Sequence, residues 1–408
     1  MQHFDIIIIG GGAAGFFTAI NAAEMNRGLK IAILERGKEV LSKVRISGGG
    51  RCNVTHAEFI PRELSRNYPR GEKELLGPFH SFMTGDTMEW FEKRGIELKI
   101  EEDGRIFPVS DSSDSIINCF QSEIERLKIN MLKNHSVQDL QKKEENWIVE
   151  TNKGDFSAEK VMLATGSNPK MWKLLAKLGH KIVLAVPSLF TFNIKDNRIK
   201  GLAGIATEAS VQVIFNSKDS KLESSGPLLV THWGMSGPAI LKLSAWGARE
   251  LNAENYKFQI KVNWLPEMTS AEILEDLRDL KIKEAKKQVA KYSRFGLPKR
   301  LWQSLVDAAG IKSEQTWAEL NKSQLEALNH QLCDAEFEVN GKSTFKEEFV
   351  TAGGVDLKEV NFKTFESKLH KNLYLAGEIL NIDAITGGFN FQNAWTGGFL
   401  AAKAMSAN

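Results

Sequence analysis

A glycine-rich turn near the N-terminus has the spacing of a dinucleotide-binding site. The apolar run DIIII (5–9) leads directly into Gly10-Gly11-Gly12-Ala13-Ala14-Gly15, which matches G-x-G-x-x-G. In such a turn Gly10 permits a sharp bend, Gly12 lets a pyrophosphate approach the backbone, and Gly15 allows close helix packing. The helix expected over residues 14–26 would offer free N–H groups to the phosphates, and we count Ala13 and Ala14 among the cofactor contacts.

An acidic residue stands where such a site needs a ribose ligand. The second apolar run, 30–34, ends at Glu35, which lies 20 residues after Gly15. A carboxylate at this position accepts hydrogen bonds from a ribose and disfavours a 2′-phosphate. We count Glu35 and the adjacent Arg36 among the cofactor contacts. These features alone do not distinguish FAD from NAD.

A second glycine-rich loop, SGGGRCNVT (47–55), follows. Its glycines permit close backbone approach to a planar ring or a phosphate. Arg51 could pair with a phosphate or hold the loop in place. Cys52 is either a small buried hydrophobe or a reactive thiol, and a redox disulfide would need a second cysteine nearby. The contacts expected from this loop are Ser47, Gly48, Gly49, Arg51, Cys52 and Asn53.

Five sequence blocks together resemble one family. They are the first glycine turn with Glu35, SGGGRCNVT (47–55), LATG (163–166), VTHWGMSGPAIL (230–241), and TAGGV (351–355) with LAGEILNIDAITGGFNFQNAWTGG (375–398). Over nearly the whole chain, this set is similar to the bacterial FAD-binding oxidoreductases known as aminoacetone-oxidase-like or BaiN-like flavoproteins. The resemblance implies bound FAD and a Rossmann-like domain interrupted by a β-barrel and a helical insert.

The chain departs from the usual pattern of that family at several places. Of the GRK motif before the second glycine loop only Lys43 remains, and we keep Lys43 as a cofactor contact. His56 replaces an Asn after the loop, and Asn381 replaces the Asp of GE-x-LD, while Asp383 remains. The segment after LATG is shorter than usual. The missing acid leaves open any catalytic role transferred from the family.

Two further segments are expected to contact the cofactor at the ends of sheet strands. The apolar strand 161–164 runs into Thr165-Gly166, where nucleotides sit in open α/β sheets, although a tight turn without a ligand has the same pattern. The resemblance places Ala164, Thr165 and Gly166 at FAD. Val137 falls where a strand of such flavoproteins lies along the adenine, and an ordinary core position is the alternative.

The C-terminal block predicts the flavin end of the site. A strand at 372–376 ends in Gly377-Glu378, and an acid there can bind the ribityl hydroxyls. A glycine pair then precedes a helix over about 390–406, whose positive N-terminal end would stabilise an anionic reduced ring. A C-terminal helix with a glycine-rich loop and no ligand is the alternative. The contacts expected here are Gly377, Glu378, Gly388, Phe389, Asn390 and Gln392.

His232, in THWGMSGP, is the candidate for proton transfer. Histidine can shuttle protons near neutral pH, whereas a structural histidine bonded to a backbone carbonyl is the alternative. The sequence has no metal-ligand spacing, no G-x-S-x-G and no P-loop, so we expect no metal. It also lacks a second strand–glycine–helix unit for a separate NAD(P) domain.

Composition limits the partners. The 53 Lys and Arg against 51 Asp and Glu give a net charge of +2, which provides no electrostatic reason to expect nucleic acid or an anionic membrane. Cys52, Cys119 and Cys333 are far apart and fit a reducing cytoplasm. The uncharged stretch 6–23 holds four glycines, so a strand–turn–helix explains it better than a signal peptide or membrane span. We expect a cytoplasmic protein that acts on a small molecule, without a nucleic-acid or membrane partner.

The 408 residues suggest two to three domains. We predict an α/β fold with a Rossmann-like FAD-binding domain interrupted by a β-barrel-like domain and a helical insert. The FAD-binding domain takes 1–186 and 351–408, the barrel-like domain 187–266 and 333–350, and the insert 267–332. Short β-rich segments after Pro187 favour the barrel, and the mixed charges of the Lys-rich insert indicate a solvated helical face.

These patterns predict an FAD-dependent oxidoreductase that transfers a hydride between the flavin and a small organic substrate. Because the sequence shows no separate NAD(P) domain, NADH or NADPH, if it is the reductant, would dock transiently at the flavin. Otherwise the organic substrate reduces the flavin, and O2 or another acceptor reoxidises it. Two alternatives stay open at this point: an amine oxidase that uses O2, and a flavin-binding redox sensor without turnover.

Overall fold

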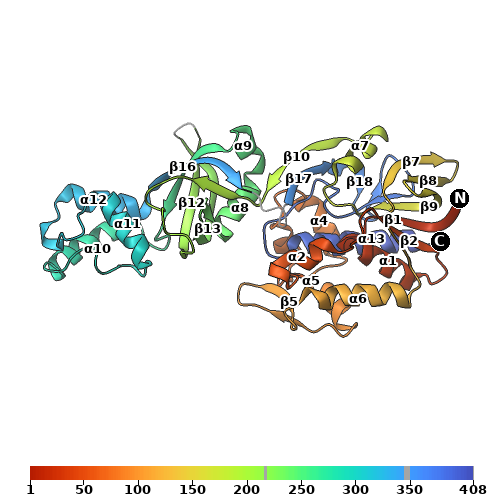
Figure 1. The fold of residues 1–408 in the computed structure, drawn as a ribbon, viewed down its shortest axis with the longest axis horizontal. Coiled ribbons are helices and arrows are strands. Elements are labelled where there is room, and N and C mark those ends of the chain that lie inside the picture. The colour runs from red at the N-terminus through yellow and green to blue at the C-terminus, as the bar shows by residue number, and fades with distance from the viewer. Residues whose placement is uncertain (216–217, 344–349, 408) are drawn as a thin grey trace. The chain divides into compact units, whose positions relative to one another are not determined.

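The computed structural model in Figure 1 describes residues 1–215, 218–343 and 350–407. The chain forms two compact units, residues 1–186 with 346–408 (unit 1) and residues 187–345 (unit 2). Each unit has its own hydrophobic core. The chain leaves unit 1 through β10 (Ile182–Ser188) and returns through β17 (Val350–Val355), and these strands pair with each other.

A nine-stranded sheet organises unit 1. Its middle strand, β1 (Gln2–Ile9), pairs in parallel with β2 (Ile31–Glu35) on one side and β9 (Gly154–Leu163) on the other. The parallel part continues with β6 beyond β2 and with β20 beyond β9. The remaining strands are antiparallel: β18 and β19 beyond β20, and the hairpin β7–β8 beside β9. The bounds are β6 (Asn130–Lys133), β7 (Val137–Lys143), β8 (Asn146–Thr151), β18 (Val360–Asn361), β19 (Glu366–Ser367) and β20 (Leu373–Leu375).

The centre of this sheet is buried on both faces. Ile6, Ile7, Ile8 and Ile9 are each at most 4% exposed, which explains why the first strand is a continuous apolar run instead of an alternating one. Helices α1 (Ala13–Met25) and α13 (Phe389–Ser406) pack closely together. A Cβ on Gly398 would lie 2.9 Å from Thr18 Oγ1, so the glycine permits this approach.

The other elements of unit 1 include a short three-stranded sheet with the order β3-β5-β4. These strands are β3 (Thr55–His56), β4 (Leu98–Ile100) and β5 (Arg105–Pro108). The helices are α2 (Ser42–Gly50), α3 (Pro61–Ser65), α4 (Glu72–Phe79), α5 (Thr84–Glu92), α6 (Ser113–Arg126), α7 (Pro169–Lys177) and the 3-10 turn η2 (Leu357–Glu359).

Unit 2 contains a closed antiparallel barrel of six strands, in the order β11-β14-β13-β12-β15-β16. Its strands are β11 (Thr191–Ile194), β12 (Ala206–Phe215), β13 (Lys218–Val230), β14 (Gly234–Ser236), β15 (Lys257–Asn263) and β16 (Ala335–Ser343). Two helices, α8 (Pro238–Trp246) and α9 (Ala248–Ala253), follow β14.

A group of helices lies between β15 and β16 along the chain. It consists of α10 (Ser270–Lys283), α11 (Lys299–Ala308), the 3-10 turn η1 (Trp317–Glu319) and α12 (Lys322–Cys333). Trp302 and Trp317 from these helices are fully buried, and their cluster includes barrel residues such as Ile260 and Phe337. Barrel and helices therefore share one core. Throughout the described residues, no helix is both long and apolar enough to cross a membrane.

Candidate functional site

The carboxyl ends of β1, β9 and β20 meet at one edge of the sheet in unit 1, because these strands are parallel neighbours. This places the segments that follow them side by side. A Cβ on Gly10 would lie 2.4 Å from the carbonyl oxygen of Ala164, and one on Gly166 would lie 3.6 Å from Glu378 Oε2. Ligands of open α/β sheets bind at such an edge. The structure therefore brings together three of the segments predicted from the sequence.

The glycines of the first turn differ in their surroundings. Gly10 has a φ of +116° and faces Ala164, and a Cβ on Gly15 would lie 2.0 Å from the Gly10 carbonyl oxygen. Around the position of a Cβ on Gly12, by contrast, no atom lies within 4 Å. Gly12 is the N-cap of α1, and no side chain caps this helix. The N-terminus of α1 thus faces open space, which suits an anionic pyrophosphate.

The Glu35 carboxylate ties the glycine turn to the end of β2. Its Oε2 accepts the Gly11 N–H at 2.9 Å and its Oε1 accepts the Gly37 N–H at 2.7 Å. A carboxylate has about four lone-pair sites, so it retains capacity for ribose hydroxyls. The Arg36 side chain beside it is exposed. Val137 is buried at the start of β7. The His135 N–H, just before this strand, donates to the Glu35 carbonyl and so brings the start of β7 close to Glu35.

The second glycine loop begins inside α2, which is kinked at Ser47, Gly48 and Gly49. A Cβ on Gly48 would lie 2.7 Å from the Phe107 ring, whereas one on Gly49 would meet no atom within 4 Å. The loop closes through the Cys52 N–H, which donates to the Ser47 carbonyl at 3.0 Å. Gly48 thus allows close packing against β5, and Gly49 leaves the backbone open to a ligand.

The Arg51 guanidinium faces the β4–β5 hairpin. Its Nη1 lies 2.6 Å from Glu101 Oε1 and 3.4 Å from Asp111 Oδ1, and the guanidinium carbon lies 3.9 Å from the Phe107 ring centre. These contacts favour the interpretation in which Arg51 holds the loop, and leave a phosphate contact as a prediction.

Cys52 is fully buried, and burial raises the pKa of its thiol to about 12. A thiol with such a pKa stays protonated at neutral pH, so it is a poor nucleophile. These surroundings favour the small buried hydrophobe over the reactive thiol.

The start of α13 packs directly on the second loop. Gly388 has a φ of +96°, and a Cβ there would lie 2.6 Å from the Thr55 carbonyl oxygen and 2.8 Å from Asn53 Oδ1. Several buried polar atoms of these segments have no hydrogen-bond partner among the described residues: Asn53 Oδ1, Thr165 Oγ1, and both Oδ1 and Nδ2 of Asn393. An unsatisfied buried group costs about 1–3 kcal/mol. A polar cofactor bound along this edge fits these atoms, since it would supply the missing partners.

Side chains of the first turn of α13 hold the helix in place. The Asn390 amide exchanges hydrogen bonds of 3.0 and 3.3 Å with the backbone of Ala384. Gln392 Oε1 accepts the hydroxyls of Thr55 at 2.6 Å and Thr87 at 3.0 Å. These side chains are therefore engaged within the protein, and the N-terminus of α13 is fixed with its positive end available. Cofactor contacts of Phe389, Asn390 and Gln392 stay predictions.

An ion pair joins two of the predicted contacts. The Lys43 ammonium pairs with Glu378 Oε2. The Glu378 side chain is 14% exposed and that of Lys43 is 55% exposed. Gly377, which precedes Glu378, has a φ of +77° and turns the chain at the end of β20. Lys43 thus orients the carboxylate that we expect to bind ribityl hydroxyls.

Three features of this site could not be assigned a role from the sequence. The His56 ring stacks on Phe389 with centroids 4.5 Å apart, and its Nδ1 lies 3.1 Å from the Gly387 carbonyl oxygen. Burial lowers the pKa of His56, which favours the neutral ring. The Tyr68 hydroxyl donates to the Phe389 carbonyl at 2.6 Å. Arg70 Nε donates to the buried Asp383 at 2.6 Å.

His56 and Asp383 carried sequence signals: His56 departs from the Asn of the family, and Asp383 is the acid that remains near GE-x-LD. Tyr68 and Arg70 have partners more than 300 positions away along the chain. No local pattern reports contacts of that range.

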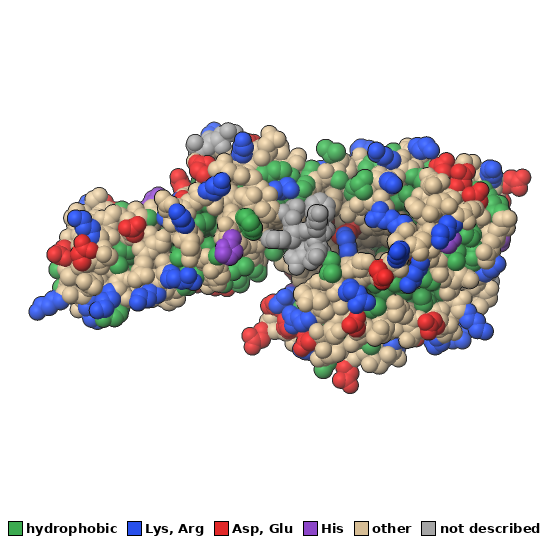
Figure 2. Space-filling model, viewed as in Figure 1, with side chains coloured by type: hydrophobic (Ala, Val, Ile, Leu, Met, Phe, Trp, Pro, Cys, Tyr) green, Lys and Arg blue, Asp and Glu red, His purple; other side chains and the backbone are tan. Residues whose placement is uncertain are grey.

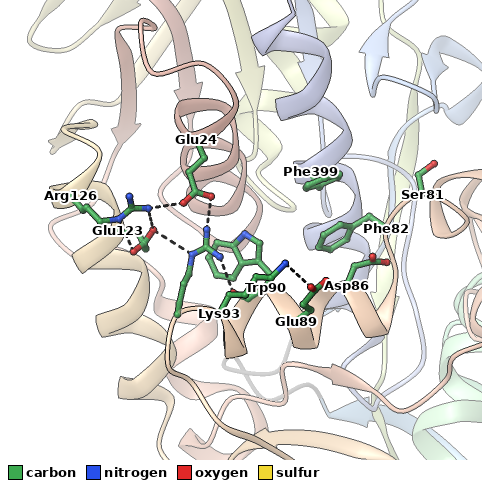
Figure 3. Close-up of a pocket in the computed structure, with 11 residues that line it drawn as sticks. Glu24, Ser81, Phe82, Asp86, Glu89, Trp90, Lys93, Glu123, Arg126 and Phe399 are labelled. Carbon is green, nitrogen blue, oxygen red and sulfur yellow. Dashed lines mark hydrogen bonds and ion pairs between the residues drawn. The ribbon is translucent and has the colours of Figure 1, made fainter.

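A cavity of about 600 Å³ lies elsewhere on unit 1, against α1, α5, α6 and α13 (Figure 3). Its charged groups pair with one another: Glu24 with Arg94 at 2.5 Å and Arg126 at 2.6 Å, and Glu123 with Arg126 at 2.5 Å. The Arg94 guanidinium also covers the Trp90 ring at 3.6 Å. None of the predicted site residues lines this cavity.

His232 belongs to unit 2. It is exposed in the turn between β13 and β14, next to Trp233, which is 59% exposed. Its role in proton transfer stays a prediction. In the described part of the chain, no group of three or more His, Cys, Asp or Glu side chains is arranged to hold a metal ion.

Comparison with known proteins gives matches over the full chain. The profile of the family described as "HI0933-like protein Rossmann domain" matches residues 4–404. The 3-dehydro-bile acid delta(4,6)-reductase of Clostridium scindens is 28% identical over 405 residues, which cover 97% of this chain and 98% of the relative. The ribosomal RNA dihydrouridine synthase of Escherichia coli is 28% identical over 416 residues, which cover 100% and 99%.

A solved structure shows the same fold. The 3-ketosteroid-delta4-(5alpha)-dehydrogenase of Rhodococcus jostii aligns with a TM-score of 0.53 and 12% identity, over 100% of this chain and 97% of that one. With the family match, this likeness confirms the predicted fold class: a Rossmann-type FAD-binding domain of mixed α/β structure with an antiparallel six-stranded barrel and helices.

Proposed function

Since the chain belongs to the HI0933-like Rossmann-domain family, in agreement with its resemblance to BaiN-like flavoproteins, we propose that it is an FAD-dependent reductase. Its reaction is the saturation of a carbon–carbon double bond conjugated to a carbonyl group. The observation that carries the cofactor assignment is the open space at Gly12, in front of an uncapped helix and on the edge where β1, β9 and β20 end.

The reaction class comes from the names of two relatives that match over 98% and 99% of their length. By nomenclature, a 3-dehydro compound carries a ketone at C3, and double bonds at C4 and C6 are conjugated with it. Dihydrouridine is uridine whose C5=C6 bond, conjugated with the C4 carbonyl, has been saturated. Both products arise when a hydride and a proton add across an activated double bond. This shared chemistry favours a reductase over the amine oxidase.

FAD, when bound, supplies the hydride. In this proposal the N-terminus of α1 binds the pyrophosphate and Glu35 the ribose. Glu378, oriented by Lys43, binds the ribityl hydroxyls. The positive end of α13, held by Tyr68 and by the Asn390 amide, stabilises negative charge at the flavin. His232 delivers the proton to the substrate carbon.

Anaerobic absorbance spectroscopy of the purified protein tests this function. We expect a yellow protein that NADH or NADPH bleaches and that a cyclic enone reoxidises without O2. Bleaching by amines alone, with reoxidation by O2, would establish the amine oxidase instead. A flavin that is reduced neither by NADH or NADPH nor by amines would favour a redox sensor. A colourless protein that takes up no FAD on reconstitution would overturn the proposal.

A second candidate substrate is a uracil base in RNA. Two relatives carry the name ribosomal RNA dihydrouridine synthase, from Escherichia coli at 28% identity and from Haemophilus influenzae at 26%, and each is matched over 99% of its length. In this candidate the expectation of no nucleic-acid partner is withdrawn. Incubation of reduced protein with RNA, followed by mass spectrometry of the digested nucleosides, should show uridine converted to dihydrouridine. Unmodified RNA alongside a reduced enone would exclude this candidate.

A further inference from the structure

A concentrated basic segment of unit 2 takes no part in the candidate cofactor site. Between Lys281 and Arg300 the sequence has eight Lys and Arg residues and one acid, Glu284, which gives 8 − 1 = +7. The whole chain carries only +2, so the rest of it sums to 2 − 7 = −5. The positive excess of the protein therefore lies in these 20 residues.

The backbone of this segment is fixed although most of it is irregular. It runs from the end of α10 to the start of α11. Val289 is fully buried, its N–H donates to the Gln315 carbonyl at 3.0 Å, and its carbonyl accepts the Trp302 indole N–H at 2.9 Å. The Lys287 carbonyl accepts the Trp317 N–H at 3.0 Å. The cations thus project from an anchored scaffold.

Part of this positive charge is not neutralised by the protein. Lys283 pairs with Asp279, and Glu284 pairs with both Lys287 and Arg294. For Lys286, Lys291 and Lys299, which are exposed, the described residues provide no carboxylate within ion-pair distance. The Arg300 guanidinium donates to the Gly201 carbonyl at 3.1 Å. This bond brings the neighbouring Lys200, which is exposed, close to the start of α11. In Figure 2, Lys and Arg side chains gather along the lower border of the region that Figure 1 labels α10 and α11.

An exposed aromatic ring lies among these cations. Tyr292 is 48% exposed, and the Lys291 ammonium lies 5.7 Å from its ring centre. Cations that follow a phosphate backbone, with an aromatic ring on which a base can stack, are the features of surfaces that bind single-stranded nucleic acid. A membrane-binding segment needs a broad apolar face instead, and the exposed large apolar side chains described between Lys281 and Arg300 are Ile282 and Tyr292.

We propose that residues 281–300, together with Lys200, form an RNA-binding surface. The free lysines contact the phosphates of a single strand, and one base stacks on Tyr292. The inference rests on the second candidate function above, because a uracil within RNA needs a surface that holds the strand, whereas a small enone does not. The cations are spread along the surface, which suits a polyanion better than a single small anion.

Fluorescence anisotropy with a labelled oligouridylate tests the surface. The triple variant Lys286→Gln/Lys291→Gln/Lys299→Gln should bind at least about tenfold more weakly than the unchanged protein at physiological salt. The slope of log affinity against log salt should become shallower by about 2, from roughly 0.7 per lost phosphate contact. The matched control Lys73→Gln/Lys153→Gln/Lys363→Gln removes the same charge from exposed positions of unit 1 and should bind normally.

A second pair of variants tests the stacking. Tyr292→Ala should weaken binding by roughly 5- to 150-fold, the loss expected when one stacked base loses its ring. Tyr292→Phe should keep the affinity, because the ring is retained. All variants should keep the flavin spectrum and the rate with a cyclic enone, which shows that the fold and the chemistry are intact.

Three outcomes would overturn the proposal that this surface binds RNA. They are equal RNA binding by the two triple variants, absence of RNA binding by the unchanged protein, and binding to phosphatidylcholine–phosphatidylserine vesicles without binding to the oligouridylate. These outcomes differ from failure of the proposed function. RNA that binds through the lysines but gains no dihydrouridine would leave the surface in place and refute only the reaction on RNA.

Discussion

The missing side chain at Gly12 leaves the N-terminus of α1 open, and it suggests a selective test. We predict that Gly12→Val abolishes FAD retention without unfolding the protein, since the residue has an extended backbone (φ −100°) and a Cβ there would have no atom within 4 Å. Loss of one or two charge-assisted hydrogen bonds, each about 1.5–3 kcal/mol, would weaken FAD binding roughly 10- to 10⁴-fold. The flavin-to-protein absorbance ratio after purification measures how much FAD the variant retains.

Gly85→Val is the matched control, because Gly85 in α5 also has no atom within 4 Å of its Cβ position and lies outside the candidate site. This variant should stay yellow. If Gly12→Val kept full flavin occupancy, the pyrophosphate would not pass over Gly12.

The proposed proton donor gives a prediction at one side chain of unit 2. We expect His232→Gln to slow reoxidation of the reduced protein by substrate by about 10²-fold, which is the usual contribution of a general acid. FAD occupancy should not change, because His232 is exposed on the barrel and belongs to no segment of the candidate cofactor site. Stopped-flow absorbance measures the rate, and His80→Gln, at an exposed position of unit 1, is the control. Equal rates for all three proteins would return His232 to a structural role.

The range of each contact decided which site residues could be predicted. The glycine turn and Glu35 follow from local spacing, because consecutive residues form the turn and the next strand carries the acid. For Arg51 two roles stayed open, and its partner Glu101 comes 50 residues later on a hairpin. The Tyr68–Phe389 and Arg70–Asp383 contacts join residues 321 and 313 positions apart, so only the folded chain reveals them.

At the scale of elements, side chains just before β10 and just after β17 fix these two strands to unit 1. His180, just before β10, has Nδ1 2.8 Å from Glu359 Oε2 and Nε2 3.1 Å from Ser367 Oγ. The adjacent Lys181 pairs with Asp356 at 2.9 Å. Both carboxylates follow β17 along the chain. The points where the chain leaves and rejoins unit 1 are thus tied together.

This cluster predicts a pH dependence of stability. Burial lowers the pKa of His180 against the opposing effect of Glu359, and burial also lowers the pKa of His56. The unfolded chain, with histidine near pKa 6.5, therefore takes up protons first as the pH falls. Stability should be constant above about pH 7 and fall as the pH drops below about 6.5. Urea denaturation across this range measures it.

His180→Gln should lower stability at pH 8, by about 1–3 kcal/mol for the lost buried contacts, and should flatten the acid dependence. His56 keeps part of that dependence. His80→Gln, at an exposed position of unit 1, is the control variant. A His180→Gln profile as steep as that of the unchanged protein would show that other groups cause the loss.

The elements themselves were predicted with different success, for physical reasons. The apolar run of β1 and the strands of the barrel follow from hydrophobic patterning, which reports burial along one segment. The closure of six strands into a barrel depends on pairings such as Thr191 with Ser343, more than 150 positions apart. Likewise, α2 is kinked at Ser47, Gly48 and Gly49, where a Cβ on Gly48 would lie 2.7 Å from the Phe107 ring of β5. A glycine pattern alone does not specify this contact.

For the whole molecule, an averaged property concealed a local one. The net charge of +2 gave no reason to expect a nucleic-acid partner. Electrostatic attraction acts over about 8 Å at physiological salt, so the local density of charge decides binding. The +7 of residues 281–300 is therefore the relevant quantity for the surface of unit 2. In the complete insert this positive charge is balanced by acids such as Glu275 and Asp276, which precede residues 281–300 along α10. The insert as a whole therefore shows only mixed charges.

The two hydrophobic cores allow unit 1 to be tested by itself. Among the described residues, the core of unit 1 contains none between 187 and 345, and the core of unit 2 contains only residues of that range. The strands that leave and re-enter unit 1 pair with each other, so a short linker can join them. We predict that a chain in which a Gly-Ser linker replaces residues 189–349 folds and binds FAD.

In this shortened chain FAD should raise the free energy of unfolding by about 2.7 kcal/mol at a free concentration about 100 times Kd, as in the full protein. Turnover of an enone should slow by at least about 10²-fold, since His232 is removed. Binding of an oligouridylate should be lost, since the lysines of 281–300 are removed. Thermal unfolding with and without FAD, together with the two assays, checks these outcomes. A shortened chain that binds no FAD while the full protein does would show that the cofactor site needs unit 2, because every residue that we assign to FAD would still be present.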